Sequence, residues 1–195
     1  MNKDIMLCGV GGQGTILASK IIASAAMREG QMVHSAETIG MAQRGGSVTS
    51  HIRIGEEASS PLIPYGYADM IISFEPAEAV RNLPYLKKDG IVIVSTSPTK
   101  PVTESLTDTG YDGVKEVEYL KSKVDVIEID GADACKRLGS QKFLNIILLG
   151  LATGSGRLGI SKETVIQEIK DRVPEKFKEA NLKAFEYGID IAGRV

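Results

Sequence analysis

The first thirty residues join a short apolar run, a group of glycines and a helical pattern, in that order. The apolar run from Ile5 to Cys8 is typical of a buried parallel strand and ends at a glycine. Residues from Thr15 to Glu29 place their apolar side chains on one side of a helix, which Gly30 then ends. A strand that enters a helix through glycines predicts an α/β fold, and it offers backbone N–H groups and a positive helix end to an anion.

The rest of the chain alternates between strand and helix patterns. Such alternation predicts a three-layer, Rossmann-like α/β domain over residues 1–195, with a mostly parallel sheet covered on both faces. The further strands are expected at Met32 to Ala36, Val48 to Ile54, Ala68 to Phe74, Ile91 to Val94 and Val124 to Ile129. The further helices are expected at Pro76 to about Lys88, Val114 to Ser122, Asp133 to Leu138, Gln141 to Thr153, Ser161 to Val173 and Pro174 to Tyr187. The segment from Pro98 to Gly113 is expected to be a loop.

Charge and hydropathy exclude two classes of partner. The chain has 23 Lys and Arg against 25 Asp and Glu, a net charge of −2, whereas nucleic-acid binders carry a basic face or domain. No apolar run reaches the roughly 18 residues of a membrane helix. Lys3 and Asp4 directly precede the first strand, unlike the start of a signal peptide. We therefore expect a cytoplasmic protein that binds neither nucleic acid nor membrane.

Cysteine and histidine usage argues against a metal site on this chain. Its cysteines are Cys8 and Cys135, too few for a four-thiolate iron–sulfur cluster or a four-cysteine zinc site. Its histidines, His34 and His51, lack the spacing of a metal-binding pair. The sequence therefore predicts no metal ligands and no catalytic residue of its own.

The glycine loop, residues 9–14, is a candidate phosphate cradle because it lies between a strand and a helix. Its pattern G-x-G-x-x-G is weak evidence alone, since Gly154 to Gly159 has it too, in what we predict to be a connecting loop. A nucleoside triphosphate site is excluded because Thr15 and Ile16 follow Gly14, where a P-loop needs lysine. The candidate ligands are Gly9, Gly11, Gly12, Gln13, Gly14 and Thr15.

A nicotinamide dinucleotide is the other ligand that this pattern suggests. It requires an acidic residue at the end of the second strand, about 20 residues after the first glycine, to hold the ribose. The nearest candidate, Glu37, lies 28 positions after Gly9, past the predicted strand end. This alternative remains open from the sequence, although the spacing does not favour it.

A second glycine-rich segment follows Glu37. Arg44 stands beside Gly45 and Gly46, which combines a charged fork of donors with a backbone that a ligand or partner can approach closely. An ordinary glycine turn with a solvated arginine explains the pattern equally well. We take Arg44 as a further candidate ligand of phosphate. The residues expected to face a partner or cleft are Met41, Gln43, Gly45, Gly46 and Ser47.

Four segments together resemble one known family. They are CGVGGQGTILASKII, SAETIGMAQRGGSVTSHIRIG, SPLIPYGYADMIISFEPAEAVR and NLKAFEYG. In this order they are similar to the gamma-type subunit or domain of the thiamine-dependent 2-oxoacid:ferredoxin oxidoreductases, and within that group to the beta subunit of the indolepyruvate enzymes. The segment MAQRGGS is far more specific than the glycine pattern.

The resemblance implies a multi-subunit enzyme that decarboxylates a 2-oxoacid, passes electrons to ferredoxin and releases an acyl-coenzyme A. This chain lacks the Gly-Asp-Gly motif of thiamine sites and the cysteines of a cluster. Thiamine diphosphate, Mg and the 4Fe–4S clusters are therefore expected on a larger partner subunit, in a hetero-oligomer. With no Trp, four Phe and six Tyr, this chain does not itself distinguish indolepyruvate from 2-oxoglutarate, pyruvate or branched-chain oxoacids.

Our hypothesis for this chain is that it helps to hold the co-substrate coenzyme A, with the glycine loop facing the phosphates and Arg44 adding positive charge. Three alternatives remain. Both loops could serve only to shape the subunit interface, the chain could be an adaptor without a ligand, or it could be a free-standing NAD(P)-dependent oxidoreductase.

Overall fold

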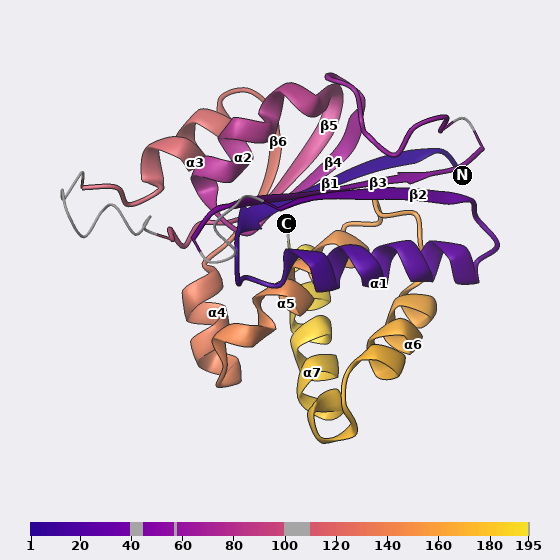
Figure 1. Cartoon of the computed structure of the whole chain (residues 1–195). Helices are drawn as coiled ribbons and strands as arrows, with labels where there is room; N and C mark the ends of the chain where they lie inside the picture. Colours follow the sequence, from indigo (N-terminus) through magenta and orange to yellow (C-terminus); the bar gives the residue numbers. More distant parts are fainter. Residues whose placement is uncertain (40–44, 57, 100–109, 195) are drawn as a thin grey trace.

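The computed structural model describes residues 1–39, 45–56, 58–99 and 110–194. Its centre is one six-stranded sheet with the strand order β2-β3-β1-β4-β5-β6 (Figure 1). Strand β3 runs antiparallel to both of its neighbours, and the other neighbouring pairs run parallel. The strands are β1 (Lys3–Val10), β2 (Val33–Ile39), β3 (Ser47–Ile54), β4 (Ala68–Ser73), β5 (Leu86–Ser95) and β6 (Asp125–Ile129).

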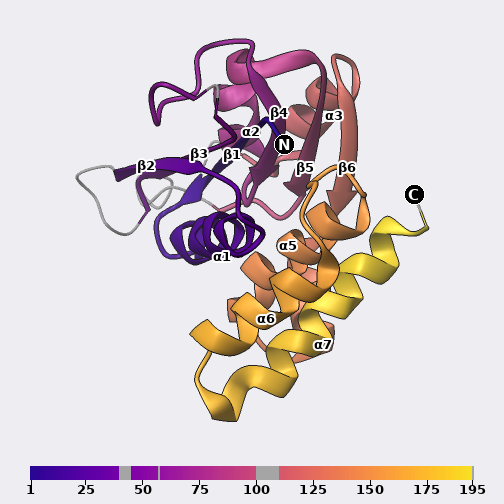
Figure 2. The same ribbon diagram turned by 90° about the vertical axis from the view of Figure 1, so that its right-hand side faces the viewer.

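Helices cover both faces of the sheet, as Figures 1 and 2 show. One face carries α1 (Thr15–Arg28), α4 (Gly131–Leu138), α5 (Leu144–Gly154), α6 (Lys162–Arg172) and α7 (Glu175–Ala192). The other face carries α2 (Pro76–Asn82) and α3 (Val114–Lys121). The predicted three-layer α/β fold is therefore confirmed, whereas the treatment of residues 1–195 as one domain stays a prediction. Among the described helices, none is long and apolar enough to cross a membrane.

Two hydrophobic cores lie on opposite faces of the sheet. The larger core joins alternate residues of the central strands, such as Ile5 and Leu7, to α1 and to the C-terminal helices. The smaller core joins the other alternate residues, such as Met6 and Cys8, to Ala79 of α2 and its neighbours. Because successive side chains of a strand point to opposite faces, this division explains why the central strands are apolar throughout.

The helix predicted from Pro76 to about Lys88 is wrong in its second half. Helix α2 ends at Asn82, a 3-10 turn occupies Leu83–Tyr85, and β5 begins at Leu86. Pro84 explains the difference, because it has no N–H for the next helical bond and its ring clashes with the preceding turn. Asp89 and Gly90, which directly follow the predicted helix, lie inside β5, where the pairing with β4 is irregular.

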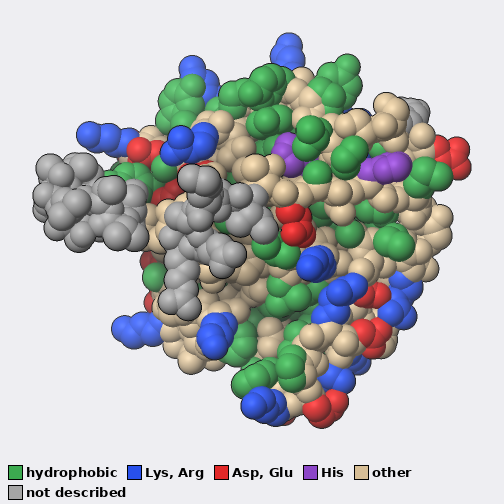
Figure 3. Space-filling view, in the orientation of Figure 1, with side chains coloured by type: hydrophobic (Ala, Val, Ile, Leu, Met, Phe, Trp, Pro, Cys, Tyr) green, Lys and Arg blue, Asp and Glu red, His purple; other side chains and the backbone are tan. Residues whose placement is uncertain are grey.

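An ionic cluster joins the second half of α6 to the end of α1. Glu168 is buried on α6 and accepts from Arg28 Nε at 2.7 Å and from Arg172 Nε at 3.3 Å. Arg28 also reaches Asp171 at 2.6 Å. Figure 3 shows basic and acidic side chains interspersed over this lower part of the molecule. These contacts hold α1, whose other end forms the candidate site.

Helices α5 and α7 approach so closely that two glycines meet. A Cβ atom on Gly150 would lie 2.2 Å from the carbonyl oxygen of Phe185, and one on Gly188 would lie 2.2 Å from that of Ile147. Both distances are far shorter than any real contact of a Cβ atom. The absence of a side chain at each position is therefore what sets the spacing of the two helices.

Candidate functional site

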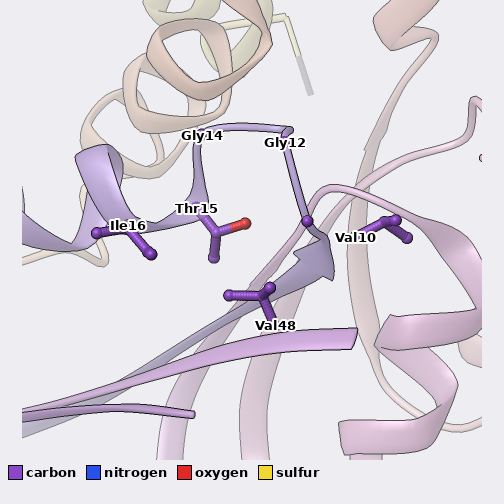
Figure 4. A pocket seen from close by; sticks show the side chains of 7 residues that line it. Val10, Gly12, Gly14, Thr15, Ile16 and Val48 are labelled. Atoms are coloured by element: carbon purple, nitrogen blue, oxygen red, sulfur yellow. The ribbon is translucent and has the colours of Figure 1, made fainter. Parts of the chain in front are cut away.

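A hollow of about 440 Å³ lies where β1 runs into α1. Three neighbouring elements line it: the backbone of the glycine loop, the first residues of α1 and the start of β3 (Figure 4). Open α/β sheets place their ligands at this end of the strands. The lining residues are Val10, Gly11, Gly12, Gly14, Thr15, Ile16 and Val48.

The N-terminus of α1 opens toward this hollow without a capping side chain. Gly14 is the N-cap and has a φ of 89°, and Gly12 has a φ of 106°. Both angles lie in the left-handed region that glycine adopts without strain. The first turn of α1 holds no acidic residue. Since the first N–H groups of a helix lack intrahelical partners and carry partial positive charge, this end of the 14-residue helix suits an anion.

Thr15 adds a side-chain donor to this helix end. The residue is 3% exposed, and its hydroxyl has no hydrogen-bond partner within the described part of the chain. In Figure 4 its side chain points from the start of α1 into the space between the glycine turn and Val48. Buried hydroxyls are normally hydrogen-bonded. An unpartnered one beside a hollow at a helix N-terminus is therefore a candidate donor to a ligand.

Gln13 ties the glycine loop to the neighbouring strand. Its Oε1 accepts from the Val10 amide at 2.7 Å, and its Nε2 donates to the Phe74 carbonyl at 3.1 Å and to Thr99 Oγ1 at 3.0 Å. A Cβ atom on Gly9 would lie 2.7 Å from Gln13 Oε1 and 2.8 Å from Phe74 Cβ. The Gln13 side chain therefore holds the shape of the loop. Gly9 has no side chain, and this leaves the space that the side-chain amide of Gln13 fills.

The described end of the second glycine-rich segment pairs with the glycine loop. Gly11 donates to the Gly46 carbonyl at 2.8 Å, and Gly45 donates back to the Gly11 carbonyl at 3.5 Å. Gly45 and Gly46 therefore lie beside Gly11, which lines the hollow. Three predicted site residues, Met41, Gln43 and Arg44, lie outside the described residues.

Two buried carboxylates, Glu75 and Glu78, lie beside the second glycine-rich segment. The sequence did not predict that they act together. Glu75 caps α2 by accepting from the Glu78 amide at 3.0 Å, and it also accepts from the Tyr111 hydroxyl. Glu78 accepts from Ser47 Oγ at 2.6 Å. Burial, and then the Glu75 carboxylate, raise the pKa of Tyr111, which keeps it a donor. The sequence signal was Glu75 before Pro76 at a strand end, which indicates a helix cap but not these long-range contacts.

Cys8 illustrates how burial overrides the nearby helix end. Its side chain is fully buried, and this burial raises the pKa of the thiol to about 12. Burial also raises the pKa of Cys135. At pH 8 only about one Cys8 thiol in ten thousand is then a thiolate. We expect Ellman's reagent to label neither cysteine in the native protein at pH 8 and both after unfolding in guanidinium. Fast labelling of the native protein would contradict this expectation.

Comparison with known proteins identifies the family. The family model described as pyruvate ferredoxin/flavodoxin oxidoreductase matches residues 4–191. The chain belongs to this family. Indolepyruvate oxidoreductase subunit IorB of Archaeoglobus fulgidus is 39% identical over 100% of this chain and 98% of its own length. The predicted resemblance to the small subunits of 2-oxoacid oxidoreductases is thus confirmed.

Two further proteins extend this comparison. The pyruvate/ketoisovalerate oxidoreductases common subunit gamma of Pyrococcus abyssi is 31% identical, over 93% of this chain and 92% of its own length. The crystal structure of a keto/oxoacid ferredoxin oxidoreductase gamma subunit from Geobacter sulfurreducens has a TM-score of 0.73, with 24% identity and 99% of both chains covered. At that identity the structural likeness shows the shared fold.

The sheet order of this family member bears on the dinucleotide alternative. In a dinucleotide site the acidic residue that holds the ribose stands on the strand next to the first one. Here β3 lies between β1 and β2, so Glu37 on β2 is two strands away from the glycine loop. Its carboxylate instead lies 3.4 Å from Ser19 Oγ of α1. This geometry does not favour a nicotinamide site.

Proposed function

We propose that this chain is the small subunit of a 2-oxoacid:ferredoxin oxidoreductase that converts an aryl pyruvate such as indolepyruvate to its acyl-coenzyme A. The substrate class is supported by sequence identity: 39% to a protein named for indolepyruvate, against 31% to one named for pyruvate and ketoisovalerate. Both relatives are named as subunits, which supports a hetero-oligomer. Ferredoxin accepts the electrons of the assembled enzyme in this proposal, and the assembly is cytoplasmic.

The redox and decarboxylation chemistry belongs to a larger partner subunit in this proposal. With two cysteines, both buried, this chain is a poor host for a 4Fe–4S cluster. It also contains no Gly-Asp-Gly segment to hold thiamine diphosphate and Mg. Thiamine diphosphate on the partner supplies the decarboxylation chemistry. The isolated small subunit is then inactive by itself.

The contribution of this chain is to hold coenzyme A at the hollow. The observation that carries this part is the unpartnered Thr15 hydroxyl at the uncapped start of α1. Helix N–H groups and this hydroxyl fit phosphate oxygens, while Val10, Ile16 and Val48 offer apolar contact to the rest of the ligand. Arg44, the remaining candidate from the sequence, would add positive charge. Arg44→Ala should therefore raise the KM for coenzyme A.

Selection of the 2-oxoacid is assigned to the partner. The name of the Pyrococcus abyssi relative states that one gamma subunit is common to pyruvate and ketoisovalerate oxidoreductases. A subunit shared by two enzymes does not decide between their substrates. By this reasoning an aryl pocket lies mainly on the larger subunit, in keeping with the absence of Trp from this chain.

The subunit assignment is tested by isolating the protein with its natural partner. We expect the tagged chain, purified anaerobically from its native host, to bring down a larger cysteine-rich protein in equal amount, together with thiamine and iron. The assembly should oxidise aryl pyruvates with coenzyme A and ferredoxin, and the separated small subunit should not. A colourless homo-oligomer without partner, thiamine or iron would overturn the proposal.

A further inference from the structure

The first turn of α2, on the opposite face of the sheet, contacts the start of β3 beside the hollow. We propose that Glu78 is a positioning residue that fixes the outer wall of the hollow through Ser47, and so controls the affinity for coenzyme A. This inference rests on the proposed function of the hollow. It concerns a residue on a helix that lines no part of the hollow itself.

The contact between Glu78 and Ser47 is short, and its acceptor is buried. Glu78 is 6% exposed, and its Oε2 accepts from Ser47 Oγ at 2.6 Å. Its Oε1 accepts from Arg81 Nε at 3.2 Å, but the Arg81 side chain is 67% exposed, so solvent weakens that ion pair. A hydroxyl that donates to a buried carboxylate makes a charge-assisted bond, about twice as strong as a neutral one. Ser47 is itself exposed, and it is the partner at the shorter distance.

Glu78 is itself held firmly in place. Its amide donates to the Glu75 cap at 3.0 Å, and its carbonyl accepts from Asn82 Nδ2 at 2.9 Å and from Cys8 Sγ at 3.5 Å. The last contact joins α2 directly to β1. Since backbone and neighbours are fixed, the Glu78 carboxylate presents a rigid acceptor to Ser47.

Ser47 passes this constraint on to the walls of the hollow. It pairs with Val10 at the end of the antiparallel β1–β3 ladder, and the bond from the Gly11 amide to Gly46 continues the pairing into the glycine loop. Val48, the next residue of β3, lines the hollow together with Val10 and Gly11. A shift of Ser47 therefore moves Val48 and the neighbouring Val10, which both line the hollow.

The expected consequence is a change in binding rather than in turnover. Ser47→Ala removes the donor at an exposed position, so the fold should survive the change. In the assembled enzyme we expect the KM for coenzyme A to rise about fivefold, which is the typical worth of one hydrogen bond, with kcat unchanged. Glu78→Gln keeps an acceptor oxygen but loses the charge. The KM of this variant for coenzyme A should therefore lie between that of the unchanged enzyme and that of Ser47→Ala.

The control is Glu118→Gln on α3, the same change at an exposed carboxylate of another helix. It should leave both kinetic constants unchanged. A third variant, Ile16→Glu, places a carboxylate in the lining of the hollow itself. If Ser47→Ala and Glu78→Gln leave the KM unchanged while Ile16→Glu raises it, the positioning role is wrong and the coenzyme A site stands. If none of the three variants changes the KM, the proposed function of the hollow fails. A fall in kcat with unchanged KM would also overturn the positioning role.

Discussion

Ile16→Glu is expected to raise the KM of the assembled enzyme for coenzyme A by about tenfold or more, which corresponds to about 1.4 kcal/mol of lost binding. Ile16 is the second residue of α1 and lines the hollow. A carboxylate at this position would face the phosphates that we assign to the helix end. It would also compete with them for the same N–H groups.

The same substitution should not weaken the fold. The first turn of α1 contains no acidic residue, and a glutamate there interacts favourably with the helix dipole, by about 0.3–1 kcal/mol. Ile16 is only partly buried, so the loss of apolar contact is limited. We therefore expect the midpoint temperature of unfolding of the isolated subunit to be unchanged or slightly higher, although binding of coenzyme A is weakened. A substitution that weakens binding without lowering stability indicates that the residue serves a ligand site rather than the fold.

Phe177→Glu provides the matched control. Phe177 lies in the first turn of α7 and is 49% exposed, so the change again places a carboxylate at a helix start in exchange for an apolar side chain. Because α7 begins away from the hollow, the KM for coenzyme A should not change. If Ile16→Glu leaves the KM unchanged as well, the helix end does not bind the co-substrate.

Gly188→Ala is expected to lower the free energy of unfolding by about 3 kcal/mol, at the upper end of the range for overpacked cores. The new methyl group would collide with the Ile147 carbonyl oxygen, 2.2 Å away, and with the Leu151 amide nitrogen, 2.9 Å away. Both atoms are helix backbone, which cannot move aside as a flexible side chain does. The midpoint of thermal unfolding should fall by roughly 6–12 °C for a chain of this size.

Gly193→Ala is the control for helix propensity. Gly193 follows the same helix, has a φ of −71°, and a Cβ atom there would have its nearest contacts at 3.8 Å. Its replacement by alanine should be neutral or slightly stabilising, because alanine loses less conformational freedom on folding. If Gly188→Ala unfolds at the wild-type temperature, the close approach of α5 and α7 does not occur in solution.

Much of the fold could be predicted because local patterns and final structure agree. The run from Ile5 through the glycine loop to α1 needed only an apolar strand, glycines and a helical periodicity. The end of α2 was predicted incorrectly because the pair Asp89 and Gly90 is typical of a helix end, whereas the helix stops before Pro84. The insertion of β3 between β1 and β2 depends on pairing between distant strands, which no local pattern reports.

The candidate site divides in the same way. The glycine loop and Thr15 follow from their place between a strand and a helix, whereas the bond between Ser47 and Glu78 joins residues 31 positions apart. The contact from Gln13 to Thr99 spans 86 positions. Such contacts follow from strand order, and a single sequence contains no record of them. Polar residues that hold a loop and polar residues that bind a ligand therefore look alike before the fold is known.

The order of elements along the chain has a consequence for biosynthesis. The larger core packs strands β1, β4 and β5 against α5 and α7, which follow all six strands in the sequence. During translation at about 5–20 residues per second, the sheet is complete seconds before its covering helices emerge from the ribosome. Over that interval the nascent subunit exposes side chains such as Ile5, Ile72 and Ile93 to water. Chaperones that recognise aliphatic segments would therefore engage it at this stage, before it joins any partner.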